Sequence, residues 1–224
     1  MKVKLLRYTQ HPEKVIAAAA KLCYSSAANY EDIMENMDDN KAAEFIQKLK
    51  SYGHYSPFEH VTFTFYIEGV SRSLLAQLTR HRLFSFSVRS QRYCNENNFE
   101  TVMPESISKN KKNAEIYNEA IGFVKDSYAE LIKNGVKPED ARSILPNACC
   151  TRLIATANVR ELWHFFGERM CIHAQSEIRQ LATEMYKQCY EVSPVLFEGM
   201  KAKCEQLNYC PEGARGCGRF DNKR

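Results

Sequence analysis

Four stretches of the chain carry the apolar and polar pattern of β-strands. They are residues 2–8, 61–67, 84–88 and 151–157. Apolar and polar residues alternate most regularly from Val61 to Ile67, with the period of two that is typical of a half-buried strand. The last stretch places Arg152 on the face opposite Leu153.

Between these stretches, apolar residues recur at helical spacing. Helices are expected from Pro12 to about residue 23, over residues 42–52, from Ser71 to about Arg82, over residues 113–136, from Asn158 to Arg169 and over residues 174–189. The stripes expected to be buried are Val15, Ala19, Leu22 and Cys23 in the first helix, and Tyr117, Ala120, Ile121, Val124, Tyr128 and Leu131 in the longest. In the helix that Ser71 begins, Gln77, Arg80 and His81 share one face. Asn158 followed by Glu161 resembles a capping box.

Helices and strands are therefore mixed along the chain, which predicts an α+β fold with a mixed sheet packed against long helices. The sequence holds no internal repeat, low-complexity tract or Gly/Pro-rich linker, so we expect one domain over residues 1–224, with a loosely ordered tail at 201–224. No run of about 18 apolar residues is present, and the N-terminus lacks the apolar region of a secretion signal. We expect a cytoplasmic protein that does not enter a membrane.

The net charge of +4 is only mildly basic, but the arginines are unevenly distributed. Residues 51–108 and residues 138–186 each contain five arginines and no lysine. Guanidinium groups tolerate partial burial and bind phosphate or carboxylate through paired donors, so the two stretches suggest two halves of an anion pocket. Structural ion pairs with acids of the same stretches are the alternative.

Nine cysteines, an odd number spread over a full-sized domain, argue against a disulfide framework. We expect most of them to be reduced and buried. In the tail, Cys204, Cys210 and Cys217 leave three interpretations open: a zinc site completed by another ligand, pairing with one another, or no role. Residues 54–60 place two histidines beside a glutamate, but we expect a hydrogen-bonded role there and no metal site.

The densest candidate chemistry lies at residues 80–93. Arg80, His81 and Arg82 are followed by seven residues and then by Ser90, with further arginines beside it. Such a set provides the donors that a phosphorylated ligand requires. Cations at a helix C-terminus also have a purely structural use. Because aromatic residues lie between the arginines, a nucleic-acid-binding module is the alternative from another functional class.

The run RHRLFSFSVRSQRY is similar to the RHR-x7-S pattern of the flavin-dependent thymidylate synthases. Upstream, GHYSPFEHVTFTF resembles the family's His-x-Ser/Thr-x-x-Glu-His segment. Downstream, LPNACCTRLIATANVRELWHFFGERM and HAQSEIRQLA resemble its later arginine-bearing segments, in the same order. The resemblance covers about residues 50–200. It implies a homotetrameric methyltransferase whose sites are shared between subunits. Such an enzyme makes thymidylate from deoxyuridylate (dUMP), with methylenetetrahydrofolate as carbon donor and NADPH-reduced flavin adenine dinucleotide (FAD) as hydride source.

The resemblance also implies site residues. Those assigned to the flavin are His54, Ser56, Glu59, Arg80, His81, Arg82, Arg169 and His173. Those assigned to dUMP are Gln77, Arg80, Val88, Arg89, Ser90, Gln91, Arg92, Arg152 and Arg179. Arg179 is the expected catalytic residue, because a fixed positive charge at the uracil edge favours the N3-deprotonated or enolate-like ring.

Ser90 is expected to bind the substrate and not to attack it. A serine hydroxyl needs a neighbouring general base, and Arg89 and Arg92 cannot accept a proton at neutral pH. We therefore expect a reaction without a protein nucleophile. A flavoprotein oxidoreductase acting on another substrate is a second alternative, since flavin contacts alone do not specify the substrate.

Overall fold

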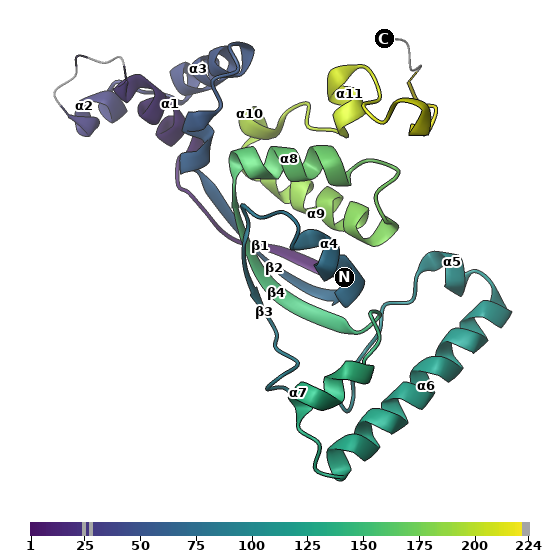
Figure 1. Ribbon diagram of the computed structural model, residues 1–224. Helices are drawn as coiled ribbons and strands as arrows, with labels where there is room; N and C mark the ends of the chain where they lie inside the picture. The colour runs from purple at the N-terminus through teal and green to yellow at the C-terminus, as the bar shows by residue number, and fades with distance from the viewer. Residues whose placement is uncertain (24–25, 27–28, 221–224) are drawn as a thin grey trace. The chain divides into compact units, whose positions relative to one another are not determined.

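The computed structural model describes residues 1–23, 26 and 29–220 of the chain. Its strands are β1 (Lys2–Tyr8), β2 (Thr62–Ser71), β3 (Ser85–Val88) and β4 (Cys150–Asn158). They form one four-stranded sheet in the order β1-β2-β4-β3 (Figure 1). Strands β2 and β4 run antiparallel, because the N–H of Arg72 donates to the carbonyl of Cys149 and the N–H of Val159 donates to that of Val61, both at 3.0 Å.

The helices are α1 (Pro12–Leu22), α2 (Tyr30–Glu35), α3 (Asp39–Ser51), α4 (Arg72–Leu78), α5 (Glu105–Ser108), α6 (Lys111–Lys133), α7 (Pro138–Ala141), α8 (Val159–Arg169), α9 (Ser176–Val192), α10 (Pro194–Phe197) and α11 (Lys203–Leu207). Short 3₁₀ helices cover Ser56–His60, Arg142–Ile144 and Gly213–Arg215. The α+β class is confirmed. Within the described part of the chain, each helix is too short or too polar to cross a lipid bilayer.

Side-chain caps explain where two of the predicted helices begin. The hydroxyl of Ser71 accepts a hydrogen bond from the N–H of Leu74 at 3.0 Å, which starts α4. The side-chain oxygen of Asn158 accepts one from the N–H of Glu161 at 2.9 Å, which starts α8. Both starting points agree with the sequence-based expectation.

The chain divides into two compact units. Unit 1 comprises residues 1–2, 66–80 and 86–154, and unit 2 comprises residues 3–65, 81–85 and 155–224. In unit 1, α5 and α7 contact the long helix α6. In unit 2, α1 packs on α3, α8 runs beside α9, and α10 and α11 pack against α9 and α8 respectively (Figure 1).

Aromatic side chains fill much of the interior of unit 2. Phe63, Phe65 and Phe165 have no exposed surface, and each such side chain contributes about 1.5–3 kcal/mol by leaving water. The ring of Trp163, the single tryptophan of the chain, lies 4.7 Å from that of Phe58 between centroids. Its indole N–H donates to the carbonyl of Leu196 at 3.0 Å, so the half-buried ring is held by both the aromatic contact and this hydrogen bond.

The buried stripe predicted for the first helix is wrong, whereas the stripe predicted for the longest helix is buried at Tyr128, half-buried at Tyr117, Ile121, Val124 and Leu131, and exposed at Ala120. In α1 the buried side chains include Ile16 and Ala17, while Leu22 is 62% exposed, because α1 packs on both α2 and α3 and its buried face is set by these neighbours. In α6 the buried residue is Tyr128 alone, and Phe123 is 74% exposed. Within unit 1, α6 contacts the short elements α5, α7 and the 3₁₀ helix Arg142–Ile144, and most of its apolar positions stay partly exposed.

The cysteines are free, as expected, but most are not buried. The buried ones are Cys149, Cys189 and Cys204, the half-buried ones are Cys94, Cys150, Cys171 and Cys210, and the exposed ones are Cys23 and Cys217. Burial raises the pKa of the Cys149 thiol to about 12.

Candidate active site

The predicted helix through Arg82 ends earlier, at Leu78, which corrects one expectation. The hydroxyl of Thr79 donates back to the carbonyl of Leu75 at 3.0 Å and closes the last turn. Gln77, Arg80 and His81 therefore do not share a helical face. His81 lies in the turn that follows and is only 5% exposed, whereas its sequence neighbours Arg80 and Arg82 are exposed.

His81 is held on both ring nitrogens by residues of α8. The Nε–H of Arg169 donates to His81 Nε2 at 2.9 Å, and Oε1 of Glu161 lies 3.3 Å from His81 Nδ1. Burial, followed by the positive charge of Arg169, lowers the pKa of His81 to about 4. His81 is therefore neutral at physiological pH and acts as a hydrogen-bonding group.

His81, Glu161 and His164 bring three possible metal-ligand atoms within 4.8 Å of one another. However, Arg169 already donates to the second nitrogen of His81. A metal-bound histidine instead donates its other N–H outward. This cluster therefore suits hydrogen bonding better than metal binding.

A cavity of about 400 Å³ in unit 2 brings two predicted flavin residues together. His54 and Ser56 line it, and Arg160 lies on the same wall. The guanidinium of Arg160 also donates to the carboxylate of Glu59 at 2.5 Å, so a third predicted residue is connected to the cavity rim. Sequence reasoning missed Arg160, although its place in a lysine-free stretch was a signal.

A second cavity of unit 2, of about 300 Å³, contains Arg169 and His173. Three thiols, those of Cys171, Cys204 and Cys210, line the same cavity. Burial raises the pKa of the Cys204 thiol, and Cys171 and Cys210 raise it further. Two of the tail cysteines thus lie next to Cys171, a neighbour that the sequence did not suggest.

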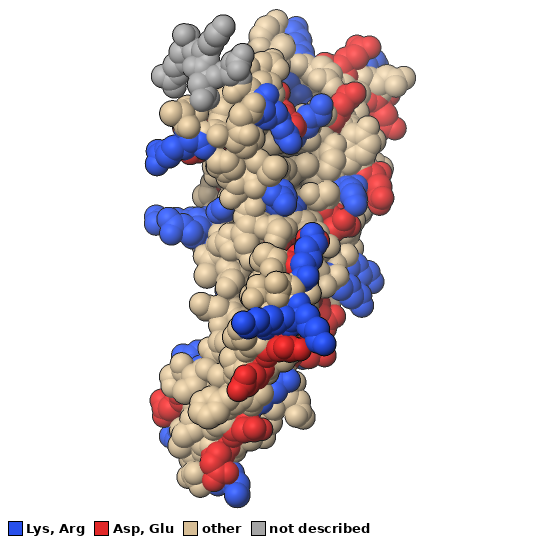
Figure 2. Space-filling model, turned by 90° about the vertical axis from the view of Figure 1, so that its right-hand side faces the viewer, with Lys and Arg blue, Asp and Glu red and all other residues tan. Residues whose placement is uncertain are grey.

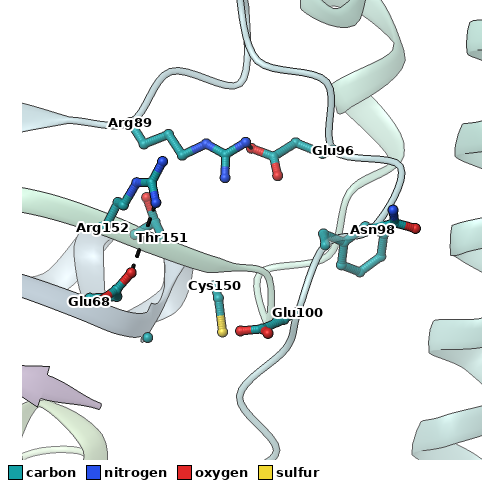
Figure 3. A pocket seen from close by; sticks show the side chains of 10 residues that line it. Glu68, Arg89, Glu96, Asn98, Glu100, Cys150, Thr151 and Arg152 are labelled. Atoms are coloured by element: carbon teal, nitrogen blue, oxygen red, sulfur yellow. Dashed lines mark ion pairs between the residues drawn. The ribbon is translucent and has the colours of Figure 1, made fainter.

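Unit 1 contains a cavity of about 350 Å³ that holds Arg89 and Arg152 (Figure 3). Arg152 points to Glu68 at 3.9 Å, and Arg89 points to the buried Glu96 at 3.6 Å. Arg89 and Arg152 thus have acidic neighbours and also line a cavity, so both interpretations of the arginine-only stretches apply here.

Two polar atoms of this cavity have no hydrogen-bond partner among the described residues. They are Nε of Arg89 and the hydroxyl of Thr151, and both are buried. Buried polar groups usually have partners, so unsatisfied ones next to a cavity indicate that a polar ligand or water completes them.

Ser90 follows β3, and its hydroxyl accepts a hydrogen bond from the N–H of Arg92 at 3.1 Å. The guanidinium of Arg92 pairs with Glu139 at 3.2 Å, and that of Arg72 donates to the carbonyl of Arg89 at 2.9 Å. The residues on both sides of Ser90 are thereby connected to other parts of unit 1, Arg89 through its backbone carbonyl and Arg92 through its side chain.

The other predicted dUMP residues lie as follows. Gln77 donates to the carbonyl of Ser73 at 3.2 Å, and Val88 and Gln91 are half-buried. In unit 2, the guanidinium of Arg179 donates to the carbonyl of Ile172 at 2.8 Å. The structure thus brings together Arg89 with Arg152, His54 with Ser56, and Arg169 with both His81 and His173.

Basic and acidic side chains are interspersed on the face drawn in Figure 2. A face specialised for nucleic acid would be expected to gather Lys and Arg into one patch. This face therefore gives no support to the alternative of a nucleic-acid-binding module.

Comparison with known proteins identifies similar chains. The sequence profile of one family, described as "Thy1: Thymidylate synthase complementing protein", matches residues 4–195. The chain is 44% identical to a flavin-dependent thymidylate synthase of Clostridium tetani, over 98% of this chain and 94% of the relative. It is 42% identical to one of Pyrococcus abyssi, over 95% and 90%.

A solved structure has a similar fold. It is the crystal structure of the flavin-dependent thymidylate synthase ThyX from Helicobacter pylori complexed with FAD and dUMP. The TM-score is 0.71 at 27% sequence identity, and the superposition covers 90% of this chain and 100% of the other.

Proposed function

The chain belongs to the flavin-dependent thymidylate synthase family, and from this premise we propose that it methylates dUMP reductively to thymidylate. Methylenetetrahydrofolate donates the one-carbon unit, NADPH supplies the reducing electrons through FAD, and tetrahydrofolate leaves. The observation that carries the proposal is the match over residues 4–195, a range that includes every predicted site residue and parts of both units. We propose that residues 1–224 act as one domain of this type.

The donors of unit 2 fit a flavin dinucleotide, whose diphosphate is an anion. Arg160 with His54 and Ser56 in one cavity, and Arg169 with His173 in the other, provide cationic and neutral donors. When bound, FAD supplies the hydride that reduces the transferred carbon. We propose that it is held by His54, Ser56, Glu59, Arg80, His81, Arg82, Arg169 and His173. His81 contributes through Arg169, because both of its ring nitrogens already have partners.

For dUMP, we propose that the phosphate and ribose are bound by donors of the arginine-only stretches. These are Gln77, Arg80, Arg89, Ser90, Gln91, Arg92 and Arg152, with the backbone of Val88. The unsatisfied Arg89 and Thr151 atoms support a polar ligand in this cavity. Arg179 is the proposed catalytic residue. Its hydrogen bond to the carbonyl of Ile172 restrains one nitrogen of the guanidinium group, and its charge stabilises negative charge on the uracil ring.

The chemistry proceeds without a protein nucleophile. The hydroxyl of Ser90 accepts a hydrogen bond from the N–H of Arg92, and the neighbouring side chains of Arg89 and Arg92 are guanidinium groups that cannot act as a general base at neutral pH. Ser90 therefore positions the substrate, and the protein accelerates the reaction by orientation and electrostatics.

We further propose a homotetramer with sites shared between subunits. The distribution of the candidate flavin residues over separate cavities of unit 2 supports this arrangement. The nine free thiols fit a reducing compartment, so we place the enzyme in the cytoplasm.

The test uses the purified full-length chain. Its visible spectrum is recorded before and after incubation with FAD, and thymidylate is then quantified with dUMP, methylenetetrahydrofolate and NADPH together, and with each omitted in turn. We expect a flavin spectrum and product only in the complete mixture. Failure to bind FAD would refute the flavin-dependent function. Flavin binding with NADPH oxidation but no thymidylate would favour an oxidoreductase with another substrate.

A further inference from the structure

Glu161 is a buried acid with a defined partner. It lies in the first turn of α8 and is 5% exposed. Its backbone N–H is held by Asn158, while its carboxylate lies 3.3 Å from Nδ1 of His81. Burial raises the pKa of this carboxyl group. Acids are rarely buried without a specific partner, so the contact with His81 needs an explanation.

The hydrogen bonds around His81 define its tautomer. A guanidinium stays protonated in proteins, so Nε of Arg169 always donates, and the Nε2 atom that it meets at 2.9 Å must accept. A neutral imidazole carries one proton, which must then be on Nδ1. That N–H faces Oε1 of Glu161.

We propose that Glu161 is a positioning residue: its carboxylate holds His81 in the Nδ1–H tautomer, and Nε2 of His81 in turn orients the side chain of Arg169. The effect on catalysis rests on the proposed function, in which Arg169 contacts the flavin. Glu161 itself touches neither flavin nor substrate in this scheme. Its role is to fix the direction of one guanidinium group.

The opposite tautomer is unfavourable on both sides of the ring. It would place two N–H donors against each other at the 2.9 Å contact with Arg169, and two acceptors against each other at the 3.3 Å contact with Glu161. Ring rotation offers little relief, because the imidazole packs on Phe165 at 5.0 Å and on Phe84 at 6.1 Å between centroids.

The imidazole is also the bridge between two ends of one helix. Glu161 and Arg169 are separated by eight residues of α8, which corresponds to roughly 12 Å along the helix axis. Their side chains therefore influence each other through His81. Loss of the acceptor at position 161 should therefore allow the side chain of Arg169, two helical turns away, to change its orientation.

Two variants separate the acceptor from the bulk of the side chain. Glu161→Gln keeps a carbonyl oxygen that can accept from Nδ1–H, so we expect the tautomer to persist and FAD affinity to change less than about threefold. Glu161→Leu fills similar space without an acceptor, so we expect the Nδ1–H form to be lost and FAD affinity to fall roughly ten- to a hundredfold, the range for a charge-assisted hydrogen bond.

The experiment labels histidines with ¹⁵N in the full-length, flavin-free chain. Long-range proton–nitrogen correlation spectra identify the tautomer of each ring, and a His81→Asn variant assigns the signal. Glu184→Gln is the matched control, because it neutralises a glutamate of α9 that pairs with Lys187 at 2.8 Å. FAD affinity of each variant is measured in parallel by titration.

A wild-type Nδ1–H signal that persists in Glu161→Gln and disappears in Glu161→Leu, with the control unchanged, supports the proposal. A wild-type Nε2–H signal, or an unchanged Nδ1–H signal in Glu161→Leu, overturns it. If Glu161→Leu does not fold, a wild-type-like tautomer and FAD affinity in Glu161→Gln still support the assignment, and loss of the tautomer there refutes it. If the wild type binds no FAD, the proposed function fails while the tautomer result stands by itself.

Discussion

The buried pair between Arg89 and Glu96 gives a direct test of the cavity in unit 1. Glu96 is 6% exposed and Arg89 about a third, and the atoms lie 3.6 Å apart. Breaking a fully buried pair costs about 3–5 kcal/mol, but the partial exposure of Arg89 reduces this to roughly 1–3 kcal/mol. Glu96→Gln, which removes the charge at constant size, should therefore destabilise the protein by about 2 kcal/mol.

The exposed pair of the same unit provides the matched control. Arg92 and Glu139 lie 3.2 Å apart, with side chains 52% and 40% exposed, so Glu139→Gln should cost less than about 1 kcal/mol. Urea unfolding of both variants measures the difference. With a slope of roughly 2–3 kcal/mol/M, Glu96→Gln should lower the midpoint by roughly 0.5–1 M. Equal midpoints for the two variants would refute the view that Glu96 is paired in a buried site.

Three further predictions concern catalysis and pH. Ser90→Ala should raise the KM for dUMP or lower turnover by about tenfold, as expected for one hydrogen bond, and complete loss of turnover with unaltered dUMP affinity would instead indicate a nucleophile. Arg179→Gln should lower kcat by roughly a hundredfold or more while the flavin spectrum stays unchanged; a wild-type kcat would remove Arg179 from the mechanism. The folded pKa of His81, about 4, lies below its unfolded value near 6.5, so its contribution to stability is complete above pH 6.5 and is lost as the pH falls toward 4. The full loss, reached below pH 4, amounts to about 3 kcal/mol of folding free energy. Most of it falls between pH 7 and pH 4.5, so wild type should lose more stability than His81→Gln over that interval in urea unfolding. Burial is the main cause of this low pKa, followed by the charges of Arg169 and His164, which lower it further, and of Glu168, which raises it. A parallel decline of both proteins would contradict the prediction.

The local parts of the fold could be predicted from the sequence. The alternation in β2 and the caps at Ser71 and Asn158 depend on neighbouring residues, and these predictions are confirmed. Packing between distant segments could not be predicted. The buried stripe of α1 depends on the elements that pack on it, and periodicity alone does not contain that information. The end of α4 depends on Thr79, whose hydroxyl closes the last turn, a role that the apolar pattern does not reveal.

The same distinction applies to the site. Motifs supplied the residue types, but the sequence did not indicate that His81 is buried or that Arg160 joins His54. The capping box predicted from the sequence explained why Glu161 lies in the first turn of α8, but it did not identify the partner of the Glu161 carboxylate. Its carboxylate instead meets a histidine eighty positions earlier in the chain, a contact that only the folded structure reveals.

The single tryptophan gives the protein an intrinsic optical reporter. Trp163 belongs to unit 2, where its indole N–H is bonded and its ring packs against Phe58. Fluorescence excited at the indole absorption band therefore reports the unfolding of unit 2. A tyrosine signal includes Tyr128 as well, which belongs to unit 1. Comparing the two signals during unfolding would show whether the halves lose their structure in one cooperative step.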